Sequence, residues 1–273
     1  MKTETVDGVT LPKIGLGTWS FGGDWDANRS SSSDGRDLAA LRRAIEIGYR
    51  HFDTAEVYSG GHSEELVGRA IRESGIAREL VFVTTKVAPE HLAYESVLAS
   101  CEGSLRRLGL DYIDLYLIHW PRRGAAFGEA FRALNELVET GKVRHLGVSN
   151  FKVDLLDRVR SLAATPILTD QVPYSLNDRS YVTNGVLEYC QRNEIVITAY
   201  SPLDQGKFKP SAAAREIAHE HKATTEQVAL AWLIAQPKVI AIPMSKDAAH
   251  LRANWESQDL ELSPKELEAL DSS

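Results

Sequence analysis

The stretch YIDLYLIH, at residues 112–119, is rich in β-branched and aromatic side chains and ends in an ionisable residue, His119. Two earlier stretches of this kind are YRHFD, which ends in Asp53, and LVFVTTK, which ends in Lys86. Asp53 lies 33 residues before Lys86, which lies 33 residues before His119. This step is about the length of one strand–helix unit. Because a barrel of such units carries every strand tip on one face, we expect the three side chains to converge on one pocket.

Strand-like and helix-like segments alternate along most of the chain. The expected strands are residues 14–18, 49–53, 80–86, 113–119, 143–149, 167–171, 195–200 and 239–242. The expected helices are residues 36–47, a stretch from residue 63, 94–108, 124–140, 153–162, 182–193, 212–221 and 225–235. A hairpin over residues 6–12, with Asp7-Gly8 as its turn, precedes them, and short helices near residues 248–254 and 264–270 follow. The pattern predicts an α/β fold, a (β/α)8 TIM barrel that forms one domain over residues 1–273.

A doubly wound sheet is the alternative for such an alternation. Its first strand–helix turn usually carries the pattern G-x-G-x-x-G, which cradles a dinucleotide phosphate. The first turn here reads GLGTWS, residues 15–20, and lacks the third glycine. We therefore prefer the barrel.

Composition limits the classes of partner. The net charge is −7 and no run of Lys and Arg occurs, so nucleic acid is not an expected partner. The longest apolar run, residues 228–235, is far shorter than the roughly 20 residues of a membrane span, and residues 1–8 lack the apolar core of a secretory signal. Cys101 and Cys190 are expected to be reduced and packed in the core. We expect a cytoplasmic protein without a metal site, monomeric rather than oligomeric, that acts on a small molecule.

Four residues suggest acid–base chemistry when they are taken together. A phenol such as Tyr58 has an ordinary pKa near 10, and a nearby ammonium such as Lys86 is expected to lower it. Asp53 would keep a buried Lys86 charged, and His119 would orient a carbonyl oxygen or share in the proton relay. The set would deliver a proton to a carbonyl oxygen.

Each of these residues has a structural explanation when it is taken alone. Asp53 could cap the segment after its strand, Tyr58 could be a packed aromatic, Lys86 could be solvated, and His119 could be a satisfied core histidine. The argument for chemistry rests on the set at matching strand tips.

The sequence resembles the aldo-keto reductase family over nearly its whole length. The motifs that carry the resemblance are GLGTW (15–19), HFDTAEVY (51–58), TK (85–86), LIHWP (117–121), GVSNF (147–151), AYSPL (199–203) and IP (242–243). The resemblance implies reversible reduction of an aldehyde or ketone by a nicotinamide cofactor, in which Tyr58 protonates the oxygen. It places the catalytic tetrad on Asp53, Tyr58, Lys86 and His119.

The resemblance also implies cofactor contacts. Ser149, Asn150 and Gln171 would bond the nicotinamide carboxamide, Tyr200 would stack on the ring, and Ser201 and Leu203 would lie along the pyrophosphate. Thr18, Trp19 and Asp53 are also expected beside the cofactor. Two alternatives stay open: Ser149 and Asn150 could cap the next helix, and Tyr200 could belong to the core.

The sequence departs from the family after the eighth expected strand. Many relatives carry basic residues where Met244 and His250 stand, and these help to hold the adenosine 2′-phosphate. Nearby substitutes are Ser245, Lys246 and Arg252, whereas Asn254 matches a position that often contacts adenine. NADP(H) is the favoured cofactor, and NAD(H) stays possible.

The substrate side is expected to be open and aromatic. Residues 171–174, QVPY, differ from the Glu-Tyr-His-Pro pattern of some branches, and the tail that closes the pocket in longer members is absent after Ser273. Trp19 and Trp120, and also Trp25, would then line the substrate side together with Tyr58 and His119. Whether the loop of residues 20–35 acts as a lid stays open.

Two other functions compete with a reductase. A regulatory protein on the same scaffold would bind the cofactor with little turnover. A barrel enzyme of another class would use Lys86 to form a Schiff base. The complete tetrad favours the reductase.

Overall fold

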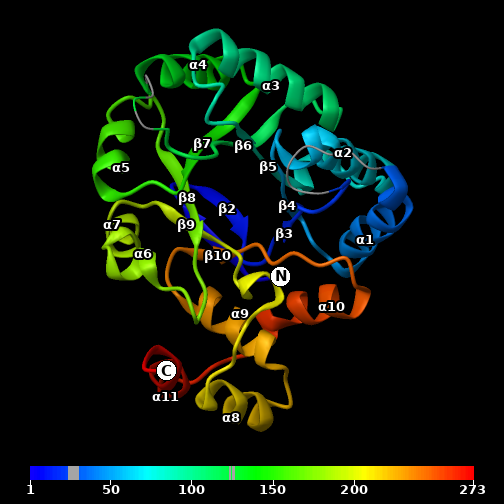
Figure 1. The fold of residues 1–273 in the computed structure, drawn as a ribbon, viewed down its shortest axis with the longest axis vertical. Coiled ribbons are helices and arrows are strands. Elements are labelled where there is room, and N and C mark those ends of the chain that lie inside the picture. The colour runs from blue at the N-terminus through cyan, green and yellow to red at the C-terminus, as the bar shows by residue number, and fades with distance from the viewer. Residues whose placement is uncertain (24–30, 123, 125–126) are drawn as a thin grey trace.

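Eight parallel strands form the centre of the molecule in the computed structural model, which describes residues 1–23, 31–122, 124 and 127–273. Neighbouring strands follow one another in chain order around the sheet (Figure 1). The strands are β3 (Leu16–Gly17), β4 (His51–Asp53), β5 (Phe82–Val87), β6 (Ile113–Ile118), β7 (Val143–Ser149), β8 (Ile167–Pro173), β9 (Val196–Tyr200) and β10 (Val239–Ala241). The observed strands confirm the predicted order and number.

The sheet closes on itself between its first and last strands. Ile14, just before β3, forms a parallel bridge with Ala241 of β10. The Gly15 N–H donates to the Ala241 carbonyl at 2.9 Å, and the Ala241 N–H donates to the Lys13 carbonyl at 2.9 Å. Closure removes the exposed strand edges that an open sheet would have, and it confirms the predicted (β/α)8 barrel.

The two glycines of the GLGTW motif permit this closure. A Cβ at Gly15 would lie 2.7 Å from a ring nitrogen of His51, and a Cβ at Gly17 would lie 2.9 Å from the Ile242 carbonyl oxygen. Both distances are shorter than van der Waals contact allows. The glycines therefore let the first strand approach its neighbours on both sides, as the barrel requires.

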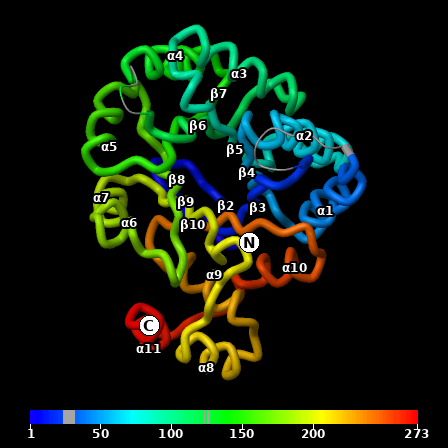
Figure 2. Tube along the Cα trace, in the orientation of Figure 1, coloured from blue at the N-terminus to red at the C-terminus, as the bar shows by residue number. Residues whose placement is uncertain are grey.

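Helices form a ring outside the strands, as Figures 1 and 2 show. The connecting helices are α1 (Asp34–Ile47), α2 (His62–Ser74), α3 (Tyr94–Leu108), α4 (Phe127–Glu139), α5 (Val153–Arg160), α6 (Ser180–Thr183), α7 (Val186–Arg192), α8 (Ala212–His221) and α9 (Thr225–Ala235). Most of them bury apolar residues against the sheet, whereas α6 buries none and α9 is buried along most of its second half. The later helices α10 (Ala248–Glu256) and α11 (Pro264–Asp271) confirm the predicted short C-terminal helices.

An N-terminal hairpin closes the end of the barrel at which the parallel strands begin. Strands β1 (Thr3–Val6) and β2 (Val9–Pro12) pair antiparallel around Asp7 and Gly8, both of which have positive φ. Apolar side chains of the hairpin pack with others from the barrel interior, namely Val6, Leu11, Leu115, Leu117, Leu168, Val196 and Ile240. The hairpin therefore seals this end and leaves the carboxyl ends of the strands for a site.

One predicted helix is wrong in its continuity. Residues 182–193 form parts of two helices, α6 and α7, because Gly185 between them has a left-handed φ of 84°. The expected first strand is also shorter, since β3 covers Leu16–Gly17 alone. The predicted loop of residues 20–35 lies partly outside the described residues, and its last part forms a short 3-10 helix, η1 (Ser31–Ser33), and the start of α1.

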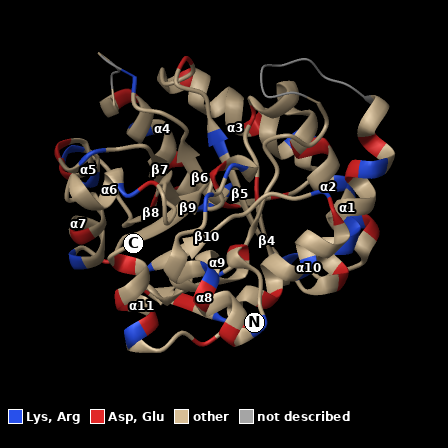
Figure 3. Cartoon of the chain, turned by 60° about the horizontal axis from the view of Figure 1, so that its bottom comes forward, with Lys and Arg blue, Asp and Glu red and all other residues tan. Residues whose placement is uncertain are grey.

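The charged residues lie mainly on the outer helices, where both signs are interspersed (Figure 3). Cys101 and Cys190 are buried free thiols, as predicted. Within the described ranges, no helix combines the length and the apolar character needed to cross a membrane.

Candidate active site

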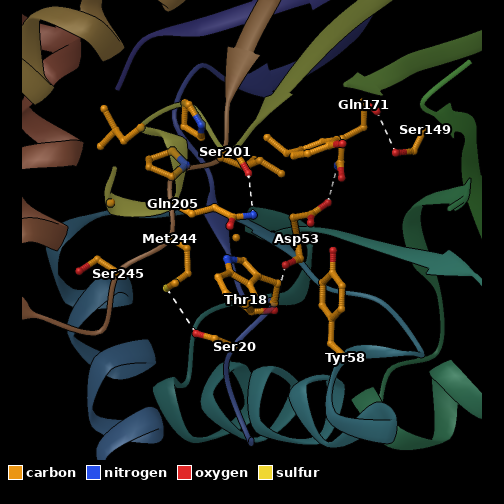
Figure 4. Close-up of a pocket in the computed structure, with 18 of the residues that line it drawn as sticks. Thr18, Ser20, Asp53, Tyr58, Ser149, Gln171, Ser201, Gln205, Met244 and Ser245 are labelled. Atoms are coloured by element: carbon orange, nitrogen blue, oxygen red, sulfur yellow. Dashed lines mark hydrogen bonds between the residues drawn. The ribbon is translucent and has the colours of Figure 1, made fainter. Parts of the chain in front are cut away.

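A cavity of about 760 Å³ opens at the carboxyl ends of the strands. This volume lies within the range of small-molecule sites. Of the predicted site residues, those that line the cavity are Thr18, Trp19, Asp53, Tyr58, His119, Trp120, Ser149, Asn150, Gln171, Tyr200, Ser201, Leu203, Ser245 and Lys246. Figure 4 shows side chains from widely separated segments converging on it.

Asp53, Lys86 and Tyr58 form a connected set at one side of the cavity. The Lys86 ammonium donates to Asp53 Oδ1 at 2.6 Å, to the Thr54 carbonyl at 2.7 Å and to the Tyr58 hydroxyl at 3.3 Å. Lys86 is 0% exposed and lies behind the residues that line the cavity. The ammonium therefore acts on the cavity through Tyr58 and Asp53.

Local structure explains how these groups meet. Asp53 and Lys86 lie on the adjacent strands β4 and β5, and both point into the barrel because side chains alternate along a strand. Tyr58 follows β4 at the start of a short turn, η2 (Tyr58–Gly61), in which Ser59 and Gly60 have left-handed φ values of 50° and 61°. From this position the phenol reaches the Lys86 ammonium at 3.3 Å.

His119 lies beside Tyr58, immediately after β6. The two rings meet edge to face with centroids 5.6 Å apart. Burial, reinforced by the charge of Lys86, lowers the pKa of His119 to about 3. The imidazole is therefore neutral near neutral pH, a state in which it can donate to or accept from a carbonyl compound without adding charge.

The expected lowering of the Tyr58 pKa is wrong for this structure. Burial raises the pKa of the Tyr58 phenol well above its ordinary value, and the charge of Asp53 adds to this effect. The physical reason is that removal from water disfavours the phenolate more than Lys86 favours it, and the ammonium lies 0.7 Å closer to Asp53 than to Tyr58. Burial also lowers the pKa of Lys86 while Asp53 opposes that shift, as expected. Tyr58 therefore keeps its proton.

A second polar group lines the cavity at the ends of β7 and β8. Gln171 donates its side-chain amide to Asp53 Oδ2 at 2.7 Å, and the Ser149 hydroxyl donates to the Gln171 carbonyl at 2.8 Å. The Asn150 amide donates to the Ser149 hydroxyl at 2.9 Å, and the Tyr200 hydroxyl donates to Asn150 Oδ1 at 2.9 Å. These amides, hydroxyls and the Tyr200 ring form one wall of the cavity.

The structural alternatives for single residues can now be compared with their contacts. Ser149 and Asn150 do not cap α5, whose N-cap is Lys152 without a side-chain cap bond. Asp53 bonds Lys86 and Gln171, and Lys86 is buried rather than solvated. Tyr200 lines the cavity and does not lie wholly within the core.

Among the described residues, no unpaired cation lines the end of the cavity near Lys246, as one would in a simple phosphate site. Lys246 donates to the Ser20 carbonyl at 2.6 Å and forms an ion pair with the buried Asp37 at 2.9 Å. The hydroxyl of Ser20 donates to the sulfur of Met244 at 3.6 Å (Figure 4). The charge of Lys246 is therefore already balanced by a carboxylate.

Besides Lys86, two predicted cofactor-contact residues lie away from the cavity lining. Arg252 is exposed on α10 and lies 3.6 Å from Glu256, while Asn254 is buried in the same helix. Thr18 lines the cavity, but its hydroxyl is occupied by bonds to the Asp53 carbonyl and to Ser63. The predicted residue Trp25 lies outside the described residues.

Some cavity residues were not predicted. Gln205 and Gly206 belong to the segment after β9, and Asp247 belongs to the segment after β10. Strand-to-helix loops at this face of a barrel form its sites, so their position after two strand ends is the signal that could have found them. In the described part of the chain, no group of three or more His, Cys, Asp and Glu side chains could hold a metal ion.

Comparisons with known proteins agree with this geometry. A model of the Aldo/keto reductase family matches residues 13–273. Methylglyoxal reductase YeaE of Escherichia coli (strain K12) is 39% identical over 269 residues, which cover 96% of this chain and 91% of that protein.

Solved structures are equally similar. A thermostable aldo-keto reductase, Tm1743, crystallised with the inhibitor epalrestat, has a TM-score of 0.95 and 42% identity, covering 100% of this chain and 99% of that one. An aldo/keto reductase from Klebsiella pneumoniae, in complex with NADP and acetate, has a TM-score of 0.88 and 35% identity, covering 99% of this chain and 94% of that one. The chain belongs to the aldo-keto reductase family.

Proposed function

We propose that this protein reduces small aldehydes and ketones to alcohols, with a nicotinamide cofactor as the hydride source and NADPH as the favoured form. The observation that carries the proposal is the bonded set of Asp53, Lys86 and Tyr58 beside His119 at the cavity wall. Aldo-keto reductases are the family in which such a set reduces a carbonyl group, and this chain belongs to that family.

Tyr58 is the proposed proton donor. Its phenol is protonated because burial raises its pKa, and it lines the cavity where a carbonyl oxygen can reach it. When the oxygen gains negative charge, the Lys86 ammonium 3.3 Å away stabilises the phenolate that forms as the proton leaves. Neutral His119 would hold the carbonyl oxygen in line with Tyr58.

The wall at the ends of β7, β8 and β9 suits a nicotinamide. Ser149, Asn150 and Gln171 offer the neutral donors and acceptors that a carboxamide requires, and the Tyr200 ring offers a face for stacking. When bound, the cofactor supplies the hydride. The wall residues would hold and orient it, and Ser201 and Leu203 would lie along its pyrophosphate.

The preference for NADPH rests on Ser245 and Lys246 at the far end of the cavity. The neighbours from Klebsiella pneumoniae crystallised with NADP or NADPH support it. The pairing of Lys246 with Asp37 opposes it, since the ammonium must be shared with a carboxylate. Contacts of Arg252 and Asn254 with the cofactor stay predictions.

The proposed substrates are small uncharged carbonyl compounds. Trp19 and the partly exposed Trp120 line the same cavity as Tyr58, and aromatic walls favour apolar faces. The relatives named methylglyoxal reductase and glyoxal reductase support two-carbon and three-carbon dicarbonyls as candidates.

A turnover assay tests the proposal. The protein is incubated with methylglyoxal or an aromatic aldehyde and with NADPH or NADH, and nicotinamide absorbance and alcohol product are followed. We expect both to change in equal amounts and faster with NADPH. Cofactor binding without turnover of any carbonyl compound would instead support a regulatory protein.

A Schiff-base enzyme is the other competing class. It would need Lys86 to reach the substrate, but Lys86 is 0% exposed and paired with Asp53. Borohydride trapping of a substrate on Lys86 would support that class, and we expect none. A cytoplasmic location and a monomeric state stay predictions.

A further inference from the structure

Asp170 is a buried carboxyl that the proposed chemistry does not use. It lies on β8 next to Gln171 and is 0% exposed. Because side chains alternate along a strand, Gln171 faces the cavity and Asp170 faces the helix side of the sheet. Asp170 therefore lies directly behind the wall formed by Ser149, Asn150 and Gln171.

The carboxyl of Asp170 meets the backbone at the point where β7 ends. Its Oδ1 accepts the Phe151 N–H at 3.3 Å, while the neighbouring Asn150 N–H donates to the Gln171 backbone carbonyl at 2.9 Å. Asn150 has a left-handed φ of 66°, a conformation that side-chain-bearing residues adopt at a cost. The carboxyl thus holds a strained turn from behind.

This turn sets the direction of the side chains in the cavity wall. The left-handed residue lets the chain change direction between β7 and α5 while Phe151 packs against Phe127 with ring centroids 5.5 Å apart. The same change of direction points Ser149 and Asn150 into the cavity. The Asn150 side chain also hydrogen-bonds Tyr200 and the His119 carbonyl. A displacement of the turn would therefore change the positions of both partners.

The surroundings of Asp170 favour the neutral, protonated form of its carboxyl group. Burial raises the pKa of Asp170 well above its ordinary value, although the two backbone N–H groups oppose this. Its titratable neighbours are Tyr181 of α6, Cys190 of α7 and Tyr200 of β9. Within the described ranges it has no ion pair, and its Oδ2 has no hydrogen-bond partner. Asparagine, which has the same shape and keeps the acceptor oxygen, is therefore a suitable replacement.

We infer that Asp170 is a positioning residue, which sets the orientation of Ser149 and Asn150 toward the nicotinamide carboxamide by anchoring the Asn150–Phe151 turn. The inference rests on the proposed function, because it concerns the residues proposed to bind the nicotinamide cofactor. It predicts that loss of the acceptor oxygen weakens cofactor binding and that loss of the charge alone does not.

The test compares Asp170→Leu with Asp170→Asn. For Asp170→Leu, the NADPH dissociation constant, read by fluorescence titration, should rise about tenfold, the scale of one lost buried hydrogen bond. Its kcat at saturating cofactor and substrate should stay within about twofold, since the tetrad keeps its contacts. Asp170→Asn should bind NADPH within about twofold of the original protein, because its side-chain oxygen still accepts the Phe151 N–H.

A control separates positioning from general destabilisation. Asp114 is also a buried carboxyl that accepts a backbone N–H, from Val83 at 2.9 Å, but it lies at the start of β6, far along the chain from the turn. Asp114→Leu should lower thermal stability and leave NADPH affinity unchanged. If Asp170→Leu does not fold, Asp170→Ala removes the acceptor without adding bulk and should weaken binding equally.

Amide hydrogen exchange provides a readout that needs no cofactor. The amides of Asn150 and Phe151 should be protected in the original protein and in Asp170→Asn, and should exchange faster in Asp170→Leu. Unchanged exchange, unchanged NADPH affinity of the leucine variant, or equal weakening by asparagine and leucine would overturn the inference. If the original protein binds neither NADPH nor NADH, the proposed function fails while the exchange experiment still decides the role of Asp170 at the turn.

Discussion

The side-chain amide of Gln171 donates a 2.7 Å hydrogen bond to Asp53 Oδ2, across 118 residues of sequence. The other oxygen of the same carboxylate accepts from Lys86 at 2.6 Å. Asp53 therefore joins the two halves of the candidate site, the proton-delivering set and the wall proposed for the cofactor. A ligand that draws on the Gln171 amide would also change the surroundings of the Asp53–Lys86 pair.

Replacing Tyr58 by Phe tests the proton donor. General acid catalysis contributes about 10²–10⁴-fold to a rate, so Tyr58→Phe should lower kcat by at least about 100-fold. Cofactor affinity should stay nearly unchanged, because the ring remains. Steady-state kinetics and a fluorescence titration measure the two quantities.

Tyr116 provides the matched control for that variant. Its hydroxyl is buried and has no hydrogen-bond partner among the described residues, so Tyr116→Phe also removes a buried phenol oxygen but outside the cavity lining. We expect it to keep full activity. Retained turnover in Tyr58→Phe would exclude Tyr58 as the proton donor.

Replacing Lys86 by Met tests the charge beside the phenol. The variant leaves Asp53 buried without its ion-pair partner, which costs about 3–5 kcal/mol of unfolding free energy. It should also remove most activity, because no cation remains to stabilise the phenolate. Urea unfolding and steady-state kinetics give the two values.

The double variant Lys86→Met/Asp53→Leu distinguishes stability from catalysis. Removing both partners should recover part of the lost unfolding free energy, because no charge is left buried alone. Activity should not recover. A double variant as active as the original protein would contradict the proposed role of the ammonium.

The stability of the fold in acid should depend on His51, a buried residue that lies two positions before Asp53 on β4. Burial lowers the pKa of His51 to about 4, against an ordinary value near 6.5. Between these values the unfolded chain binds more protons than the folded chain does. The folded state therefore loses about 1.4 kcal/mol per pH unit from this one residue as the pH falls.

The variant His51→Gln isolates that contribution. Glutamine cannot titrate in this range. As the pH falls from 6.5 toward 4, the original protein should therefore lose unfolding free energy relative to the His51→Gln variant. Urea unfolding at half-unit steps of pH measures the difference. A difference that does not vary with pH would show that His51 does not titrate as the structure predicts.

Lys246 should contribute to the choice between NADPH and NADH, and Arg252 should not. Lys246 lines the cavity, whereas Arg252 is exposed outside it. Lys246→Met should weaken NADPH binding several-fold more than NADH binding, and only modestly because Asp37 already balances its charge. Separate titrations with the two cofactors at low and high salt check this.

Arg252→Met is the comparison for that experiment, since it removes a cation of the same segment. It should leave the ratio of the two dissociation constants unchanged. A larger effect from Arg252 than from Lys246 would mean that the phosphate lies along α10 rather than at the cavity end.

The repeating pattern of strand and helix, read from the sequence, determined the barrel and the meeting of Asp53, Lys86 and His119. It could do so because strand alternation and the common face of strand tips are local rules that apply to every unit. The motifs around Tyr58, Ser149, Gln171 and Tyr200 predicted further site residues, and these four do line the cavity.

The tertiary structure alone decided burial and partners. It paired Lys246 with Asp37, joined Gln171 to Asp53, and placed Asp170 behind the Asn150 turn. It also reversed the expected shift of the Tyr58 pKa, because burial outweighs a lysine whose charge Asp53 already balances. A pKa depends on how much water and which charges surround a group, and those surroundings come from segments far apart in the chain.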